Sequence, residues 1–287
     1  MNPLSQPVAF VLLAVLAPAL VTGLLLLLTL KWPSARGWIG ALAVGIGYAL
    51  GHAANLGLAP PFPPTQSTHA LFYIALAAAI AGALRGASRL PSAVGWLAFT
   101  AVAAGAPWML LRNVLQRWSA GEVASTLFFI ALAIVALVFV LDGWAERRRG
   151  VQLPLVLWLT TTLTAVALVL GGNAIYAQFG ASLAGVLGAC IVFGWIARDV
   201  SYARGATIVF AVVLCCFCLA GVLLSNLPRA AGILLFYSPL AAVAVDRGPV
   251  ARLSPRMATV ARLLAVALVA GLAVLLAQLH RPAPSEY

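Results

Sequence analysis

Apolar stretches of about twenty residues recur along the whole chain, and they limit what it can fold into. A helix needs about 20 mostly apolar residues to cross a bilayer, and Pro, Gly and charged residues divide this sequence into stretches of that length. The pattern predicts an all-α, polytopic transmembrane helix bundle that forms a single domain over residues 1–287. The predicted spans are 8–30, 38–58, 69–84, 94–113, 121–141, 153–171, 178–197, 205–224, 230–245 and 257–279. Those at 69–84 and 230–245 are short for a full span, so tilted or re-entrant segments are the alternative there.

The composition excludes most other classes of protein. Hydrophobic residues make up 64% of the chain and charged residues only 8%, and the mean hydropathy is +1.08. A soluble globular chain is about 45–50% apolar and about 25% charged. A soluble enzyme, a nucleic-acid-binding module, a disulfide scaffold and a disordered chain are therefore ruled out.

The basic residues alternate between the two ends of the predicted spans. The chain has 17 Lys and Arg against 6 Asp and Glu, a formal net charge of +11. Thirteen basic residues fall at one set of ends, and the other set holds only Arg112, Arg117, Arg229 and Arg281. Because positive loops stay on the cytoplasmic side, ten spans with both termini outside are predicted. The excess charge then has anionic headgroups of the cytoplasmic face as its partner, and it needs no nucleic acid.

The start of the chain bears on its location. Residues 1–7 carry no Lys or Arg, so the positively charged region of a signal peptide is missing and the first apolar stretch is interpreted as a retained helix. No loop is long enough for a soluble domain, and a single Lys against sixteen Arg is typical of a GC-rich bacterial genome. We expect an integral protein of the bacterial cytoplasmic (inner) membrane.

Matching features in the two halves favour an inverted repeat. Division near Gly150 gives five spans in residues 1–150 and five in 151–287, and an odd number inverts the second half, as in many transporters. Each half carries a ridge of small residues, Ala43, Gly47 and Gly51 in one and Gly180, Ala184 and Gly188 in the other. Each half also has a proline deep in a span, expected to kink the helix: Pro107 and Pro239. Because Gly and Pro are common in membrane helices, a plain ten-helix bundle is the alternative.

All the acidic residues are predicted at span ends or in loops: Glu122, Asp142, Glu146, Asp199, Asp246 and Glu286. An ionisable group in the bilayer interior is costly and usually functional. The lack of a carboxylate at membrane depth argues against a proton antiporter, a rotary ring subunit and an intramembrane aspartyl protease. Sodium coupling through carbonyls and hydroxyls stays open.

Polar residues near the predicted outer face form a candidate pocket. His52 and Asn55 share one helical face, and His69 opens the next span after the stiff segment 60–64, Pro-Pro-Phe-Pro-Pro. Metal-ligating His side chains must converge at about 2 Å from the ion, which spacing alone does not establish, so no metal and no cofactor is predicted. The alternative is interfacial His and Asn side chains that bond to loop backbone.

A second group of polar residues follows Pro107 at the same predicted face. Arg112 and Asn113 end one span and Glu122 opens the next, which suggests an anion-binding corner at the mouth of the pocket. The alternative is an Arg that extends to the interface and pairs with Glu122. Within another span, Thr160 and Thr164 share a polar face that could coordinate a solute or sodium, or simply cross-link helices.

No catalytic residue is predicted. Cys215 and Cys218 form a C-x-x-C pair inside an apolar run, where thiolates are disfavoured and the thiols should be inert. Three functions remain: a small-molecule transporter or permease without a carboxylate-based proton relay, a non-catalytic membrane subunit that packs against a partner protein, and an outer-leaflet lipid-processing enzyme built on His52, His69 and Arg112. The transporter, acting on a small polar solute, is the preferred hypothesis.

Overall fold

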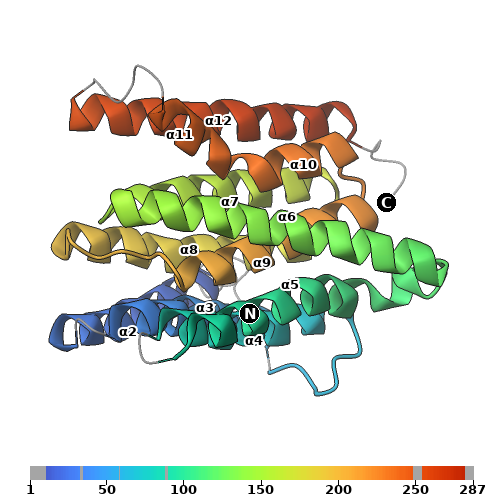
Figure 1. The fold of residues 1–287 in the computed structure, drawn as a ribbon. Coiled ribbons are helices and arrows are strands. Elements are labelled where there is room, and N and C mark those ends of the chain that lie inside the picture. The colour runs from blue at the N-terminus through green and yellow to red at the C-terminus, as the bar shows by residue number, and fades with distance from the viewer. Residues whose placement is uncertain (1–10, 33–34, 58, 88–89, 248–253, 282–287) are drawn as a thin grey trace, which may run out of the picture.

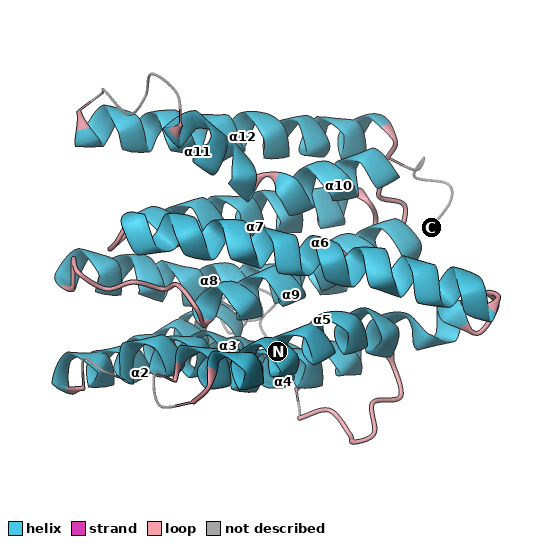
Figure 2. Ribbon diagram, viewed as in Figure 1, coloured by secondary structure: helices cyan, strands magenta, loops and turns pink. Residues whose placement is uncertain are grey.

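The computed structural model describes residues 11–32, 35–57, 59–87, 90–247 and 254–281, and every regular element in these ranges is helical (Figures 1 and 2). A short π-helix, η1 (Val11–Leu16), leads directly into the first long helix. The α-helices are α2 (Ala17–Lys31), α3 (Arg36–Leu56), α4 (Ser67–Gly86), α5 (Ser92–Leu115), α6 (Ala120–Arg147), α7 (Gln152–Leu170), α8 (Ala174–Ile196), α9 (Ala206–Leu223), α10 (Arg229–Tyr237), α11 (Pro239–Asp246) and α12 (Pro255–Leu279).

The helices are long and apolar enough for a multi-pass membrane protein. Nine of the described helices qualify as membrane spans by length and hydropathy, or ten if the pair α10 and α11 counts as one span. The prediction of an all-α bundle is therefore confirmed, and the nine or ten helices that could span a membrane agree with the ten spans predicted. The stretch that looked short at 69–84 is part of α4, which has 20 residues and can cross a bilayer.

Helix α9 lies at the centre of the bundle. It packs against α4, α3, α5, α6 and α10, and 83% of its span is buried against only 17% for α6. The two aromatic side chains of α9, Phe210 and Phe217, are fully buried. In Figure 1, α2 to α5 form the lower part of the bundle and α10 to α12 the upper part. The faces of α2, α6 and α12 that point away from α9 are rich in exposed Leu and Phe, as a lipid-facing surface is.

The stretch predicted as a short span at 230–245 is a broken helix. Its two pieces, α10 and α11, are bent by 49° relative to each other, and Pro239 is the first residue of α11. Proline has no N–H to donate to the carbonyl four residues earlier, here that of Leu235. The Ser238 hydroxyl donates to this carbonyl instead (2.9 Å), and Thr160 Oγ1 of α7 lies 3.2 Å from Ser238 Oγ. The break is thus both satisfied internally and tied to α7.

Pro107 and Pro239 have different surroundings, although the sequence pairs them. Pro107 is buried within α5, which continues as one helix from Ser92 to Leu115. The pair α3 and α4 packs along its length, whereas α8 and α9, the expected counterparts, have only a small contact. The inverted repeat of residues 1–150 and 151–287 therefore stays a prediction.

Close backbone contacts between α3, α4 and the start of α9 depend on glycine. A Cβ built on Gly82 would lie 2.7 Å from the Gly205 carbonyl oxygen and 2.9 Å from Ala41 Cβ. A side chain at this position would therefore push α4 away from α9, the helix around which the others pack. On α5, by contrast, a Cβ at Gly105 would have no atom within 4 Å.

We expect Gly82→Ala to lower the free energy of unfolding by about 1–3 kcal/mol, the usual cost of overpacking a core. Gly105→Ala, the matched control, should leave stability unchanged or raise it by up to about 1 kcal/mol, because Ala is the better helix former. Thermal melting of both variants in detergent would measure the difference. Equal melting temperatures for the two variants would contradict the close packing of α4 on α9.

Candidate functional site

Basic residues gather at one end of the bundle, which we call the basic end. Here α2, α4, α6, α8 and α11 finish and α3, α5, α7, α9 and α12 begin, at the left in Figure 1. The described basic residues at this end are Lys31, Arg36, Arg85, Arg147, Arg148, Arg149, Arg198, Arg204, Arg247, Arg256 and Arg262. The described basic residues at the opposite end are Arg112, Arg117, Arg229 and Arg281.

Asp142, near the end of α6, is buried and is the first of two carboxylates that join helices at the basic end. Its side chain is only 7% exposed, and Oδ2 accepts a hydrogen bond from Arg85 Nη1 of α4. Oδ1 accepts from the backbone N–H of Arg204 at 2.8 Å and from the Thr207 hydroxyl of α9. The Arg85 guanidinium carbon also lies 4.1 Å from the ring centroid of Trp96, a cation–π contact. A buried charge is tolerated when it is paired and hydrogen-bonded, and this one joins three helices.

The loop between α8 and α9 presents Arg204 in an unusual conformation. Its φ of 67° lies in the left-handed region, which is uncommon for a residue with a side chain. This conformation lets the backbone N–H bind Asp142 while the guanidinium Nε donates to Glu146 Oε1 at 2.7 Å. In the same loop the Tyr202 hydroxyl donates to the Cys190 carbonyl at 2.7 Å, and burial raises the pKa of that hydroxyl well above its usual value. The loop is therefore fixed at both residues.

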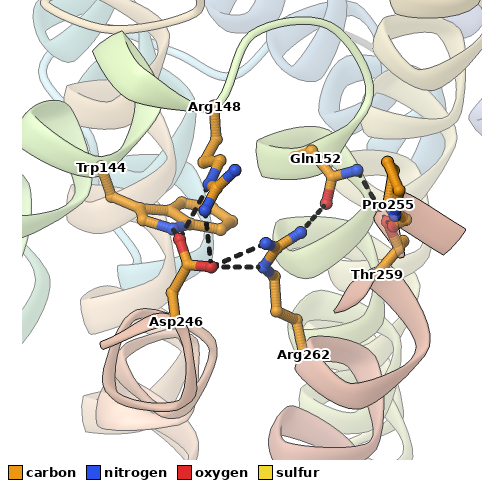
Figure 3. A network of polar contacts seen from close by, with 7 residues as sticks. All are labelled: Trp144, Arg148, Gln152, Asp246, Pro255, Thr259 and Arg262. Carbon is orange, nitrogen blue, oxygen red and sulfur yellow. Dashed lines mark hydrogen bonds and ion pairs between the residues drawn. The ribbon is translucent and has the colours of Figure 1, made fainter. Parts of the chain in front are cut away.

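Asp246, the last residue of α11, is the second of these carboxylates, and it is partly buried (Figure 3). Trp144 Nε1 of α6 and Arg148 Nε, directly after α6, donate to Oδ2 at 3.0 and 2.9 Å. Arg262 of α12 donates to Oδ1 from Nη2 at 2.6 Å and from Nε at 3.0 Å, and its side chain is only 4% exposed. Arg262 Nη1 also donates to Gln152 Oε1 of α7 at 3.0 Å. One carboxylate thus joins α11, α6 and α12, and through Arg262 also α7.

A polar cavity of about 630 Å³ opens at the basic end beside Asp142. Its charged lining consists of Arg85, Arg147, Arg204, Arg247, Asp142 and Glu146. A second hollow of about 440 Å³ lies beside Asp246 and also has Arg147 and Arg247 in its wall. The two hollows thus share these arginines in their walls, and we call the larger one, beside Asp142, the basic cavity.

The charges of the basic cavity suit a small anion. Its two carboxylates are engaged, Asp142 by Arg85 and Glu146 by Arg204. Among the described residues no carboxylate pairs with Arg147 or Arg247, and both are exposed to the cavity. Guanidinium groups stay charged and match carboxylate and phosphate oxygens with paired N–H donors. The volume lies in the range of about 300–1,000 Å³ that is usual for small-molecule sites.

The structure places the histidine pocket predicted from sequence at the junction of α3 and α4. His52 is fully buried and stacks on Phe179, with 3.9 Å between ring centroids. Its Nε2 lies 2.9 Å from the Thr68 carbonyl oxygen, so it donates there, and Nδ1 accepts from the Tyr48 hydroxyl at 3.3 Å. With both nitrogens engaged, His52 has none left for a ligand or a proton transfer.

The neighbours of His52 also bond within the protein. Asn55 Nδ2 donates to Ser182 Oγ of α8 and to the Gly51 carbonyl, each at 2.8 Å. His69 Nδ1 lies 3.1 Å from Thr65 Oγ1 at the surface. In the part of the chain that the structure describes, no three His, Cys, Asp or Glu side chains come together to hold a metal ion.

Arg112, Asn113 and Glu122 lie around the turn between α5 and α6. Arg112 and Asn113 are exposed. Glu122 forms a capping box with Ser119 at the start of α6, where its carboxylate accepts from the Ser119 N–H at 2.9 Å. Among the described residues, no hydrogen bond or ion pair joins this group to His52, Asn55 or His69.

Thr160, Thr164 and the cysteines are buried in the bundle. Thr164 Oγ1 donates to the Thr160 carbonyl at 2.8 Å, and Thr160 contacts Ser238 at the break between α10 and α11. Both hydroxyls are therefore used within and between helices. All four cysteines are free and buried.

The residues of the basic cavity were not singled out from the sequence. From the sequence, the arginines serve to orient the chain, and Asp142 and Asp246 are predicted at span ends or in loops. Their pairing joins residues far apart in sequence, such as Arg85 with Asp142 and Arg148 with Asp246. The available signal was that four of the six acidic residues, Asp142, Glu146, Asp199 and Asp246, fall at the same ends as most of the arginines. Comparison with protein-family models, with curated proteins and with solved structures found no match for this chain.

We expect Asp246→Asn to destabilise the protein by about 3–5 kcal/mol, because it leaves the buried Arg262 without its counter-charge. The control is Glu146→Gln, which breaks the exposed pair with Arg204. The side chain of Glu146 is 47% exposed and that of Arg204 is 66% exposed. Such surface pairs contribute about 0–1 kcal/mol. Denaturant titration in detergent would compare the two, and similar losses would show that the Asp246 network does not stabilise the bundle.

Proposed function

We propose that this protein is a permease-type transporter for a small anionic solute, with the basic cavity as its cytoplasmic binding site. The observation that carries the proposal is a cavity of about 630 Å³ in a multi-pass bundle, lined by four arginines, of which Arg147 and Arg247 have no carboxylate partner among the described residues. The positive-inside rule supports placing the basic end in the cytoplasm and both termini outside. The membrane would be a bacterial inner membrane, whose anionic headgroups attract the same end.

The broken span supports transport through this part of the bundle. Transporters commonly build their solute sites beside discontinuous helices, and Arg247 directly follows α11, the second piece of the broken span. A change in the bend between α10 and α11 would shift Arg247 relative to Arg147 on α6. The cavity could therefore open or tighten around an anion without rearrangement of α9.

The positions of the carboxylates support a mechanism without a carboxylate-based proton relay. Asp142 and Asp246 both lie at the basic end and are each held by arginines and other donors. Thr160 and Thr164, at span depth, are bonded to helix backbone or to Ser238. Exchange of one anion for another would need no further coupling group.

We expect the double variant Arg147→Gln/Arg247→Gln to bind anions at least tenfold more weakly. A hydrogen bond to a charged group contributes about 1.5–3 kcal/mol, and about 1.4 kcal/mol corresponds to tenfold in affinity. Binding would be measured as the rise in melting temperature with inorganic phosphate, citrate and glycerol 3-phosphate. Radiolabelled exchange in proteoliposomes would then follow any anion that binds.

The matched control for this test is Arg149→Gln/Arg256→Gln. It removes the same charge from the basic end, but neither residue lines the cavity and both are exposed. The proposal predicts that only the cavity variant loses binding and exchange. Equal effects of the two double variants would mean that the anions respond to the general positive surface, and no binding by the native protein would reject the proposal.

A second candidate function, a subunit that packs against a partner membrane protein, is favoured by a groove along α8. Two apolar hollows of about 610 and 560 Å³ flank this helix and share Val15, Gly185 and Gly188. A Cβ at Gly188 would have no atom within 4 Å. Small residues on a lipid-facing helix let a second helix approach closely.

The outer-leaflet lipid-processing enzyme has less support, because the protein already engages both nitrogens of His52 and Arg112 lies at another helix junction.

We expect Gly188→Leu to release a partner if the groove is an interface, because Leu would fill the open space without disturbing the fold. The readout is the size of the complex on native gels of mildly solubilised membranes. Gly105→Leu, at another open glycine on α5, is the control and should keep the complex. A chain that migrates as a monomer before any substitution would reject this second function.

A further inference from the structure

A crevice opens sideways between α6 and α10 at the end of the bundle opposite the basic end. Its volume is about 580 Å³, and α9 forms its floor through Cys215, Cys218 and Leu219. Phe129 of α6 and Ile233 of α10 stand at its sides, 66% and 60% exposed on the lipid-facing surface. We call this feature the α6–α10 crevice.

The crevice exists because the broken span changes partners at its bend. Helix α11 packs against α6, whereas α10 packs against α9 and α12 and has little contact with α6. The 49° bend between the two pieces therefore leaves α6 and α10 apart over the outer half of their length. Leu219, Val222 and Leu223 of α9, a helix that is otherwise buried, are partly exposed in the gap.

The crevice is apolar along its depth and basic at its rim. Arg229, the first residue of α10, lines it at the end of the bundle together with Trp118, a residue type that favours the membrane interface. Arg229 is exposed, and no carboxylate among the described residues pairs with it. Phe236 lies seven residues further along α10, about 10 Å deeper at 1.5 Å per residue. A ligand for this shape needs an anionic head and a flexible apolar chain.

We infer that the α6–α10 crevice binds one phospholipid with an anionic headgroup. An acyl chain would lie along α9 between Phe129 and Ile233, and the phosphate would bind the Arg229 guanidinium, whose N–H donors match phosphate oxygens. The surrounding bilayer supplies this ligand directly, because the crevice is open to the hydrocarbon between two lipid-exposed helices. The site is independent of the proposed transport through the basic cavity, which lies at the other end of the bundle.

Photo-cross-linking would test the site. The full-length protein would be reconstituted in phosphatidylcholine vesicles that contain a small fraction of phosphatidylglycerol, or of phosphatidylcholine, with a photoreactive acyl chain. We expect the phosphatidylglycerol probe to label α6, α9 and α10 around the crevice more strongly than the phosphatidylcholine probe does. If the protein is transferred into detergent before irradiation, the crevice should still be labelled, because its lipid stays bound. The exposed face of α12 around Leu268 should then not be labelled, because its lipid has been removed.

Two variants separate the chain from the headgroup. Ala133→Phe, on the α6 side of the crevice, should fill the crevice and abolish its label, whereas Leu268→Phe on the lipid face of α12 should leave the label unchanged. Arg229→Gln, an exposed change that leaves packing intact, should remove the preference for the phosphatidylglycerol probe, and Arg117→Gln at the same end should not. Three results would each overturn the inference. They are equal labelling of α12 and the crevice, an unchanged probe preference in Arg229→Gln, and a co-purifying protein that occupies the crevice and excludes both probes.

Discussion

Two carboxylates, Asp142 and Asp246, join the helices at the basic end of the bundle through ion pairs and hydrogen bonds. Asp142 attaches α6 to α4 and to the start of α9, and Asp246 attaches α11 to α6 and α12. Only a small part of the α6 span is buried, so the contacts of Asp142 and Asp246 at its end contribute much of its attachment to the bundle. Removal of one partner of a buried ion pair is costly because the other charge stays buried. The same arginines that would orient the chain in the membrane therefore also fold it.

The sequence predicts the class of fold because the bilayer allows few alternatives. Hydrocarbon cannot hydrogen-bond to backbone, so an apolar stretch of sufficient length has to become a helix. The predicted stretches at 38–58 and 94–113 match α3 (Arg36–Leu56) and α5 (Ser92–Leu115) to within two residues at each end. The stretch at 69–84 seemed short because Arg85, Gly86 and the polar residues 67 and 68 were left out, although they belong to the helix.

Which charged side chains pair with each other could not be predicted from the sequence, for a different reason. The partners Arg85 and Asp142 are 57 positions apart, and the pattern of charges is the same whether each residue meets water or its partner. His52 shows the converse limit. Its spacing from Asn55 suggested a ligand site, but the ring is held by Tyr48 one turn earlier and by a backbone carbonyl of the next helix, which spacing on one face cannot reveal.

The break at Ser238 and Pro239 shapes both the basic cavity and the α6–α10 crevice. A continuous helix from Arg229 to Asp246 would have a single axis, whereas the bend lets α11 pack on α6 at the basic end and α10 separate from α6 at the opposite end. The first arrangement brings Arg247 to the basic cavity, and the second opens the α6–α10 crevice. Because the Ser238 hydroxyl replaces the hydrogen bond that Pro239 cannot make, the bend leaves the Leu235 carbonyl satisfied. The contact of Thr160 with Ser238 then joins α7 to this bend.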